Sequence, residues 1–135
     1  MGDILNFSIN LDGRSVTWID KWMMEVSSDK DFYSELLNKF ERRLKEIEIK
    51  ENQKIITVSH TIPSRKFSGH HKEELQNFLT AYSGSTLLGD ILKRNPVDYH
   101  FCGHTHKPAK GKIGKSLVRN IGADFYDFRY WTLEI

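Results

Sequence analysis

Three histidines in this 135-residue sequence stand directly after apolar runs, where metal-binding side chains are often found. His60 ends the β-branched run at 54–59, and His104 and His106 follow Gly103 at the end of a second apolar run. Neutral imidazole is the commonest side-chain ligand for zinc, manganese, iron and related ions. Ligand sites in layered α/β proteins lie at the carboxyl ends of strands. We therefore expect the three rings to converge on a metal site.

The spacing of His104 and His106 favours two ions over one. Residues at i and i+2 of a straight strand point the same way, but at a turn opened by Gly103 the two rings are expected to splay toward different ions. Gly103 is expected to supply the backbone freedom for this turn, and Pro108 to keep the following loop irregular. A single histidine at a strand end, or a surface His-x-His pair, also occurs without a metal, so the prediction rests on the combination.

Other chemistry-bearing residues have simpler explanations. His70 and His71 read as the solvated start of a helix, and Arg65 and Lys66 as part of a solvated loop. Cys102 is expected to be a buried strand residue, because zinc thiolates usually come in clusters. Trp18, Trp22, Met23 and Met24 are expected to pack in a core or an interface.

Composition narrows the class of protein. The length predicts a single domain over 1–135, with 1–27 as an uncertain extension or a rearranged N-terminus. The formal net charge of +2 provides neither a basic footprint for nucleic acid nor a polybasic membrane patch. Cys102 is the only cysteine, so no internal disulfide forms and a reducing compartment is indicated. With no secretory signal and no apolar run long enough to span a membrane, we expect a cytoplasmic protein.

The apolar pattern predicts an α/β fold. Asp12-Gly13 is expected to form a turn between two short apolar pieces, and Ser28 to cap a long amphipathic helix at 29–50. The run at 54–60 reads as a strand buried on both faces. A helix is expected at 71–82, and another after Ser85 that stops at Asn95-Pro96. Further strands are expected at 97–102, 116–121 and 130–135.

Several of these segments resemble one family. Thr57–His60 and Phe101–His106 resemble the two C-terminal motifs of the calcineurin-like metallophosphoesterases, and Phe78–Ser85 with Leu88–Leu92 resembles the segment between those motifs. The likeness begins at about Trp18. It implies the C-terminal half of an αββα layered sandwich, with a mixed sheet flanked by helices.

The resemblance also implies a two-metal phosphoester hydrolase using manganese, iron, zinc or similar divalent ions. His60 and His104 would bind one ion and His106 the other, with Ser59 and Thr105 positioning the backbone. The paired ions would hold a bridging hydroxide and neutralise charge on the phosphoryl oxygens. The substrate class is not indicated.

The acidic motifs that the family carries upstream are not convincingly present. Asp98-Tyr99-His100 matches Asp-x-His formally, but it lies inside the strand that leads into Gly103, where family members carry core residues. Gly2-Asp3 and Gly89-Asp90 each lack an aspartate three positions later. Three imidazoles without carboxylates cannot hold two divalent ions against their mutual repulsion. We therefore expect little or no phosphoesterase activity from the isolated chain.

Two further expectations follow from this incomplete set of motifs. The strands would leave an apolar sheet face uncovered, which predicts self-association or a complementary N-terminal segment as its cover. The alternative function is a non-catalytic metal-binding or assembly module derived from the same fold.

Overall fold

The computed structural model of the protein describes residues 8–11, 14–17, 29–68, 84–124 and 126–134. The chain divides into two compact units, residues 1–43 and residues 44–135. The single domain expected over 1–135 stays a prediction. None of the helices in the described ranges is long and apolar enough to cross a membrane.

The first unit contains a strand pair and most of a long helix. β1 (Ser8–Leu11) and β2 (Arg14–Thr17) pair antiparallel, with Leu11 opposite Arg14. The turn expected at Asp12-Gly13 and the cap expected at Ser28 lie outside the described residues. α1 (Asp29–Glu46) confirms the predicted amphipathic helix but ends before Lys50. The chain then turns between Lys50 and Gln53, where Asn52 has a positive φ of 65°.

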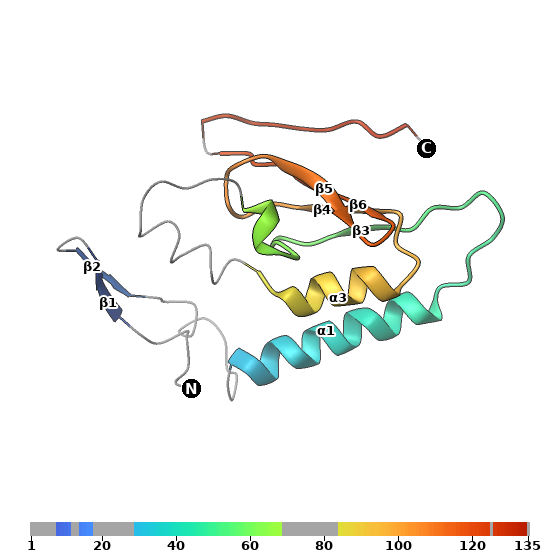
Figure 1. Ribbon diagram of the computed structural model, residues 1–135, viewed down its shortest axis with the longest axis horizontal. Helices are drawn as coiled ribbons and strands as arrows, with labels where there is room; N and C mark the ends of the chain where they lie inside the picture. The colour runs from blue at the N-terminus through green and yellow to red at the C-terminus, as the bar shows by residue number, and fades with distance from the viewer. Residues whose placement is uncertain (1–7, 12–13, 18–28, 69–83, 125, 135) are drawn as a thin grey trace. The chain divides into compact units, whose positions relative to one another are not determined.

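The second unit is built on a mixed four-stranded sheet in the order β3-β4-β6-β5 (Figure 1). Its strands are β3 (Ile56–Val58), β4 (Tyr99–Cys102), β5 (Ala109–Ile113) and β6 (Ser116–Asn120). β3 and β4 are parallel, as are β4 and β6, whereas β5 and β6 form an antiparallel hairpin. The expected α/β fold with a mixed sheet is confirmed.

Two helical segments lie near one face of this sheet, the inner face. η3 (Arg65–Phe67) is a single 3-10 turn, and α3 (Thr86–Arg94) is capped at its N-terminus by Ser85, whose hydroxyl accepts a hydrogen bond from the Leu87 amide. Asn95 caps the other end through its side-chain amide, which donates to the Ile91 carbonyl. Both ends of α3 agree with the prediction. The helix expected at 71–82 lies outside the described residues.

The inner face of the sheet combines apolar and polar buried side chains. Ile62, Phe67, Leu92, Val97 and Val118 are buried in the core of this unit. His100, Ser116 and Asn120 are fully buried among them. Each of these polar side chains is hydrogen-bonded, Ser116 for example to the carbonyl of Val97 at 2.8 Å. Burying a polar group costs free energy unless it is hydrogen-bonded, so these bonds select one strand register.

The outer face of the sheet is open, which corrects the expectation for the run at 54–60. Val58 is 73% exposed and Ile56 40% exposed, so β3 is not buried on both faces. The reason is its position, since β3 is an edge strand and its side chains alternate between the two faces.

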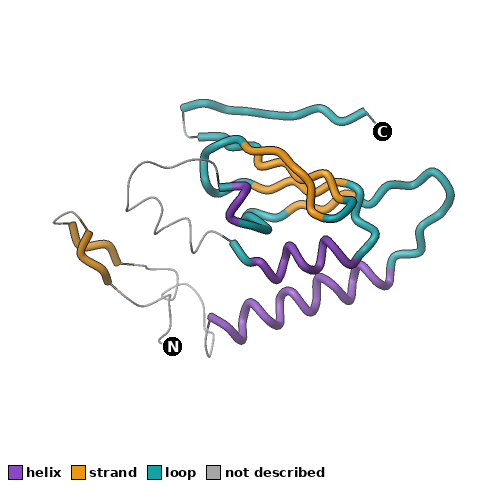
Figure 2. Tube along the Cα trace, in the orientation of Figure 1, coloured by secondary structure: helices purple, strands orange, loops and turns teal. Residues whose placement is uncertain are grey.

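The segment at 126–134, called the tail here, is not the strand expected at 130–135. Figure 2 shows it as an extended loop along the outer face of the sheet. Among the described residues it pairs with no strand, and β structure requires such a partner. The Arg119 guanidinium stacks on the Trp131 ring at 3.8 Å from its centroid.

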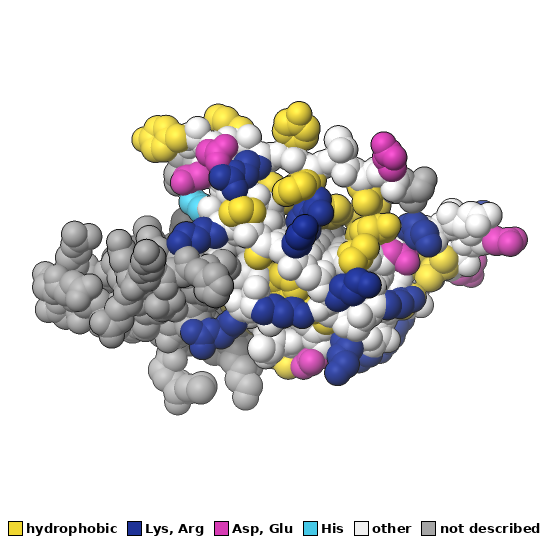
Figure 3. Space-filling view, turned by 45° about the horizontal axis from the view of Figure 1, so that its top comes forward, with side chains coloured by type: hydrophobic (Ala, Val, Ile, Leu, Met, Phe, Trp, Pro, Cys, Tyr) yellow, Lys and Arg dark blue, Asp and Glu magenta, His cyan; other side chains and the backbone are white. Residues whose placement is uncertain are grey.

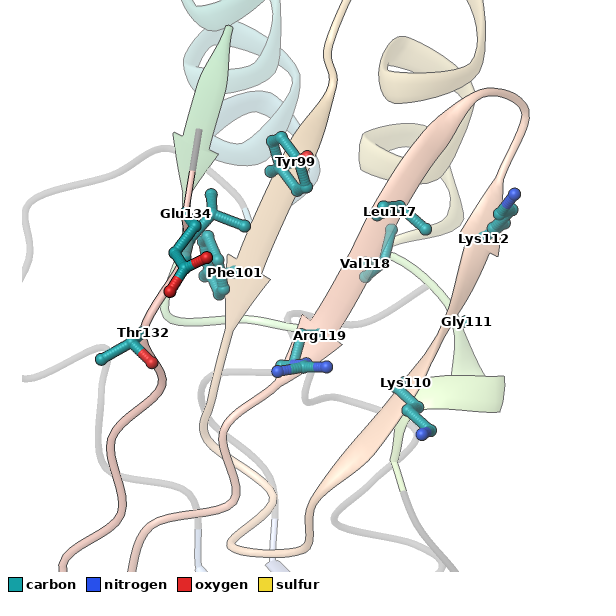
Figure 4. Close-up of a pocket in the computed structure, with 11 residues that line it drawn as sticks. Tyr99, Phe101, Lys110, Gly111, Lys112, Leu117, Val118, Arg119, Thr132 and Glu134 are labelled. Atoms are coloured by element: carbon teal, nitrogen blue, oxygen red, sulfur yellow. The ribbon is translucent and has the colours of Figure 1, made fainter. Parts of the chain in front are cut away.

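Between the tail and the sheet lies a cavity of about 510 Å³ (Figure 4). Tyr99 and Phe101 from β4, Leu117 from β6 and Leu133 from the tail supply its apolar lining, while Lys110, Lys112, Arg119 and Glu134 add charged groups. The tail therefore covers the outer face only in part.

β5 is the strand that sequence reasoning missed. It follows Pro108 directly, so the expectation that Pro108 leads into an irregular loop is wrong. Pro is tolerated immediately before a strand because it is there outside the hydrogen-bonded ladder. Ile113 pairs with Ser116 across a two-residue turn in which Gly114 has a φ of 55°. That glycine was the available signal for a hairpin.

Burial of His100 makes the stability of the fold pH-dependent. Burial lowers the pKa of His100 from 6.5 to about 4. Between pH 6.5 and about 4, His100 binds a proton in the unfolded chain but not in the native protein. The contribution of the neutral ring to the unfolding free energy is therefore complete above pH 6.5 and is lost as the pH falls to about 4. We expect a loss of about 3 kcal/mol, measured by urea denaturation across this range. The variant His100→Gln lacks the titrating ring and should show a shallower slope; equal slopes would contradict this origin.

Candidate metal-binding site

Three polar strand ends meet at one edge of the sheet. β3, β4 and β6 run parallel, so their carboxyl ends lie on the same side. His60 follows β3 by two residues, His104 follows β4 by two residues, and Asp124 follows β6 by four. This is the edge at which layered α/β proteins bind ligands.

His60 and His104 are in direct contact. Nε2 of His60 and Nδ1 of His104 are 2.8 Å apart, and one of these nitrogens donates a hydrogen bond to the other. The rings meet edge to face, with centroids 4.8 Å apart and planes at 88°. The backbone supports this contact, since the Gly103 amide donates to the His60 carbonyl at 3.1 Å. Two of the three predicted ligands are thus brought together.

The loop after β4 owes its shape to the histidines themselves. His104 has a φ of 69° and His106 a φ of 54°, both in the left-handed region. Gly103 does not have a positive φ, so the expectation that it supplies the conformational freedom of the turn is wrong. A Cβ at Gly103 would meet only the His60 carbonyl, at an ordinary 3.8 Å. Left-handed residues other than glycine cost free energy and cluster at functional sites, and here two of them alternate.

His106 points to a different partner. Its Nδ1 lies 3.5 Å from Oδ1 of Asp124, and both side chains are about half exposed. The two histidines of the loop therefore have different partners, His104 contacting His60 and His106 facing Asp124, whereas the predicted pair of ions stays a prediction. Sequence reasoning missed Asp124. The available signal was an aspartate after the apolar run at 116–121, at the same sheet edge.

The buried side chain of Asn120 stabilises the histidine loop by hydrogen bonds. Its side-chain amide donates to the Thr105 hydroxyl and to the Phe67 carbonyl, both at 2.7 Å. Its side-chain oxygen accepts from the Gly122 amide at 3.1 Å. Thr105, expected to have a positioning role, is thereby fixed between the two histidines by a buried side chain on β6.

The donors present match a divalent ion only in part. His60 and His104 offer two converging imidazole nitrogens, which suit zinc, manganese or iron. Within the described ranges, however, no group of three or more His, Cys, Asp or Glu side chains could hold a metal ion. The described residues thus provide a two-imidazole pair and, separately, a histidine–carboxylate pair.

The remaining residues considered from the sequence do not join the site. Asp98 accepts a hydrogen bond from the Ile55 amide at 2.9 Å, and both ring nitrogens of His100 lie against hydroxyl groups, so Asp98-Tyr99-His100 ties β4 to β3. Cys102 is a buried free thiol, as expected. Lys66 donates to the Lys112 carbonyl. His70, His71, Trp18, Trp22, Met23 and Met24 lie outside the described residues.

Comparison with known proteins identifies one family. The family model described as calcineurin-like phosphoesterase matches residues 4–108, which include His60, His104 and His106. No curated protein and no solved structure matches the chain. The match confirms the resemblance noted in the two histidine segments.

Gly122 is the glycine on which the histidine loop depends most. It has a φ of 64°, and a Cβ there would overlap the Pro108 nitrogen and the Lys107 carbonyl carbon. We expect Gly122→Ala to lower the unfolding free energy by at least about 1–2 kcal/mol, from the left-handed strain alone. The added methyl group should also shift the amide NMR signals near His106.

Gly103→Ala is the matched control, because a Cβ there meets only an ordinary contact. Its effect on the unfolding free energy should stay below about 1 kcal/mol. If Gly103→Ala proved the more damaging change, the assignment of the tight backbone contact to Gly122 would be wrong.

Proposed function

Because the chain belongs to the calcineurin-like phosphoesterase family, we propose that it takes part in metal-dependent phosphoester hydrolysis, with His60 and His104 as ligands of one divalent ion. The proposal rests above all on the 2.8 Å contact between Nε2 of His60 and Nδ1 of His104. Two ring nitrogens this close, on loops after adjacent parallel strands, are able to turn their lone pairs toward a single cation. His60 is exposed and His104 is half-buried, so an ion and a substrate would reach them from solvent.

We assign His106 to a second ion. Its ring faces Asp124 and not the His60–His104 pair. A carboxylate that accepts a hydrogen bond from Nδ1–H orients the imidazole and leaves Nε2 as the donor to a metal. Divalent manganese, iron or zinc would supply Lewis acidity toward the phosphoryl oxygens of a substrate.

We propose that catalysis needs ligands from outside the described residues. Two nearby divalent ions repel each other unless anionic groups lie between them. The described residues place one carboxylate, that of Asp124, beside a candidate ligand, and no group of three ligands occurs among them. A second copy of the chain or a complementary segment is one source that would complete the site.

The alternative is a non-catalytic metal-binding or assembly module, and the open outer face favours it. Val58, Ile56 and Leu117 are exposed on the sheet, and the tail exposes Tyr126, Phe128 and Tyr130. Figure 3 shows hydrophobic side chains on this face, with Lys and Arg among them. Several large apolar side chains exposed on one part of a protein are a feature of interaction surfaces.

A cytoplasmic location is also part of the proposal. The only cysteine, Cys102, is a buried free thiol. Burial raises the pKa of this thiol to about 12, so it carries almost no thiolate at neutral pH. A chain without a disulfide suits a reducing compartment.

Metal titration tests the proposed ligands and separates a metal-binding protein from an assembly module that binds no metal. Calorimetric titration of the full chain with Mn²⁺ or Zn²⁺ should give one weak site. We expect His60→Ala and His104→Ala each to weaken it by at least about tenfold, because each removes a donor atom. His106→Ala is the matched control and should leave this site within about threefold.

The same variants should be sized by light scattering. Loss of metal affinity in His60→Ala and His104→Ala supports these two residues as metal ligands and excludes an assembly module that binds no metal. A stable oligomer whose metal content none of the three substitutions changes would favour the assembly module.

Hydrolysis by the chain alone is expected to stay at background. With Mn²⁺ and p-nitrophenyl phosphate as the probe, the release of nitrophenol should match a blank containing His104→Ala. The reason is that the part of the chain described by the structure provides too few anionic ligands around the imidazoles. Robust turnover that disappears in His104→Ala would show that the ligand set is larger than proposed here.

A further inference from the structure

His100 is a fully buried histidine on the inner face of β4, opposite Thr57 in the parallel register with β3. Both of its ring nitrogens lie against hydroxyl groups. Nδ1 is 2.8 Å from the Thr57 hydroxyl, and Nε2 is 3.1 Å from the Ser59 hydroxyl. These two hydrogen bonds fix the orientation of the buried imidazole ring.

The direction of these hydrogen bonds follows from Ser59. Its hydroxyl donates to the Thr61 carbonyl at 2.6 Å. A hydroxyl has one proton to give, so toward His100 the Ser59 oxygen acts as an acceptor. Nε2 of His100 therefore carries the proton, and Nδ1 accepts from Thr57. The Thr57 hydroxyl is farther from its other acceptor, the Tyr99 carbonyl, at 3.4 Å.

This direction excludes a catalytic serine–histidine pair. A nucleophilic serine would have to give its proton to Nε2 of His100. Here Nε2 already holds a proton, and the Ser59 proton points to Thr61. Burial also lowers the pKa of His100, which keeps the ring neutral. The ring therefore serves a positioning role.

A chain of hydrogen bonds runs from Thr57 through His100 and Ser59 to Thr61. Its last two members are the residues directly before and after His60. Ser59 precedes His60 and Thr61 follows it, and one hydroxyl group ties the two together. The Ser59 amide also donates to the Phe101 carbonyl at 3.0 Å. The backbone on both sides of His60 is thus held to β4, the strand that leads into His104.

We propose that His100 is a positioning residue for the metal pair, whose Nε2–H, acting through the Ser59 hydroxyl, fixes the Ser59–Thr61 turn and so holds His60 against His104. The placement of His60 by His100 follows from this geometry alone, whereas its effect on metal binding rests on the proposed function. Asp98-Tyr99-His100 then stabilises the site through its hydrogen bonds to the segment at 55–59.

The first test needs neither a metal nor a variant. Long-range ¹H–¹⁵N NMR of the full chain should show His100 neutral and protonated on Nε2, and nuclear Overhauser contacts should join the rings of His60 and His104. A proton on Nδ1 of His100 would reverse the proposed hydrogen bonds and overturn the inference. Because no ion is present, failure of the proposed function leaves this test intact.

The second test compares Ser59→Ala with Ser59→Thr. Loss of the hydroxyl should remove the contacts between the His60 and His104 rings and weaken Zn²⁺ binding by about tenfold, whereas Ser59→Thr should keep both within about threefold. Ser116→Ala is the matched control, because it removes another inner-face hydroxyl, one bonded to Val97. It should lower stability without changing the ring contacts.

These tests distinguish failure of the positioning role from failure of the proposed metal binding. A folded Ser59→Ala protein with unchanged ring contacts overturns the inference. Wild-type protein that shows the ring contacts but binds no Zn²⁺ overturns the proposed function and leaves the positioning role standing. If Ser59→Ala does not fold, the protonation state of His100 in the wild type decides the question.

Discussion

The parallel pairing of β3, β4 and β6 is the constraint on which the rest of the site depends. Parallel strands end on the same side of a sheet, so residues far apart in the chain reach one edge together. His60 and His104 are separated by 43 intervening positions, yet their ring nitrogens touch. Without this register, neither the imidazole pair nor the nearby His106–Asp124 pair would form.

Buried polar groups hold that register in place. His100, Ser116 and Asn120 are all fully buried, and each spans from one strand to a neighbouring segment. Apolar burial already opposes a one-residue slip, because it would turn the buried side chains to the other face, and an unsatisfied buried donor or acceptor adds a cost of about 1–3 kcal/mol. The buried polar side chains of the inner face thus reduce apolar burial but favour a single arrangement of the loops that follow β3, β4 and β6.

Much of the fold could be predicted because its signals are local. α1 has helical spacing over 18 residues, and α3 has a serine cap and an asparagine–proline stop. β5 was missed because its residues alternate between lysine and small or apolar types, which suits an edge strand but lacks an apolar run. The segment at 130–135 has the composition of a strand, but strand formation also needs a neighbour, and that is a property of the surroundings.

For the candidate site, the sequence indicated which histidines would be considered but not how they are arranged. His60, His104 and His106 were found from strand ends followed by imidazoles, but Asp124 lies after a strand with no other distinguishing feature. Gly103 was expected to carry the turn because glycine usually does. The backbone instead takes positive φ values at the two histidines, and Asn120 holds Thr105 between them by a hydrogen bond that the sequence does not reveal.

The left-handed conformations of His104 and His106 limit which side chains these two positions accommodate without strain. Asparagine, aspartate and glycine tolerate such backbone angles well, yet none of them has a ring nitrogen. Histidine is among the few residue types enriched in this region that also offers an aromatic nitrogen donor. At each position histidine therefore suits both the backbone angles and the ring nitrogen that the proposed metal site would require, and few other amino acids would satisfy both.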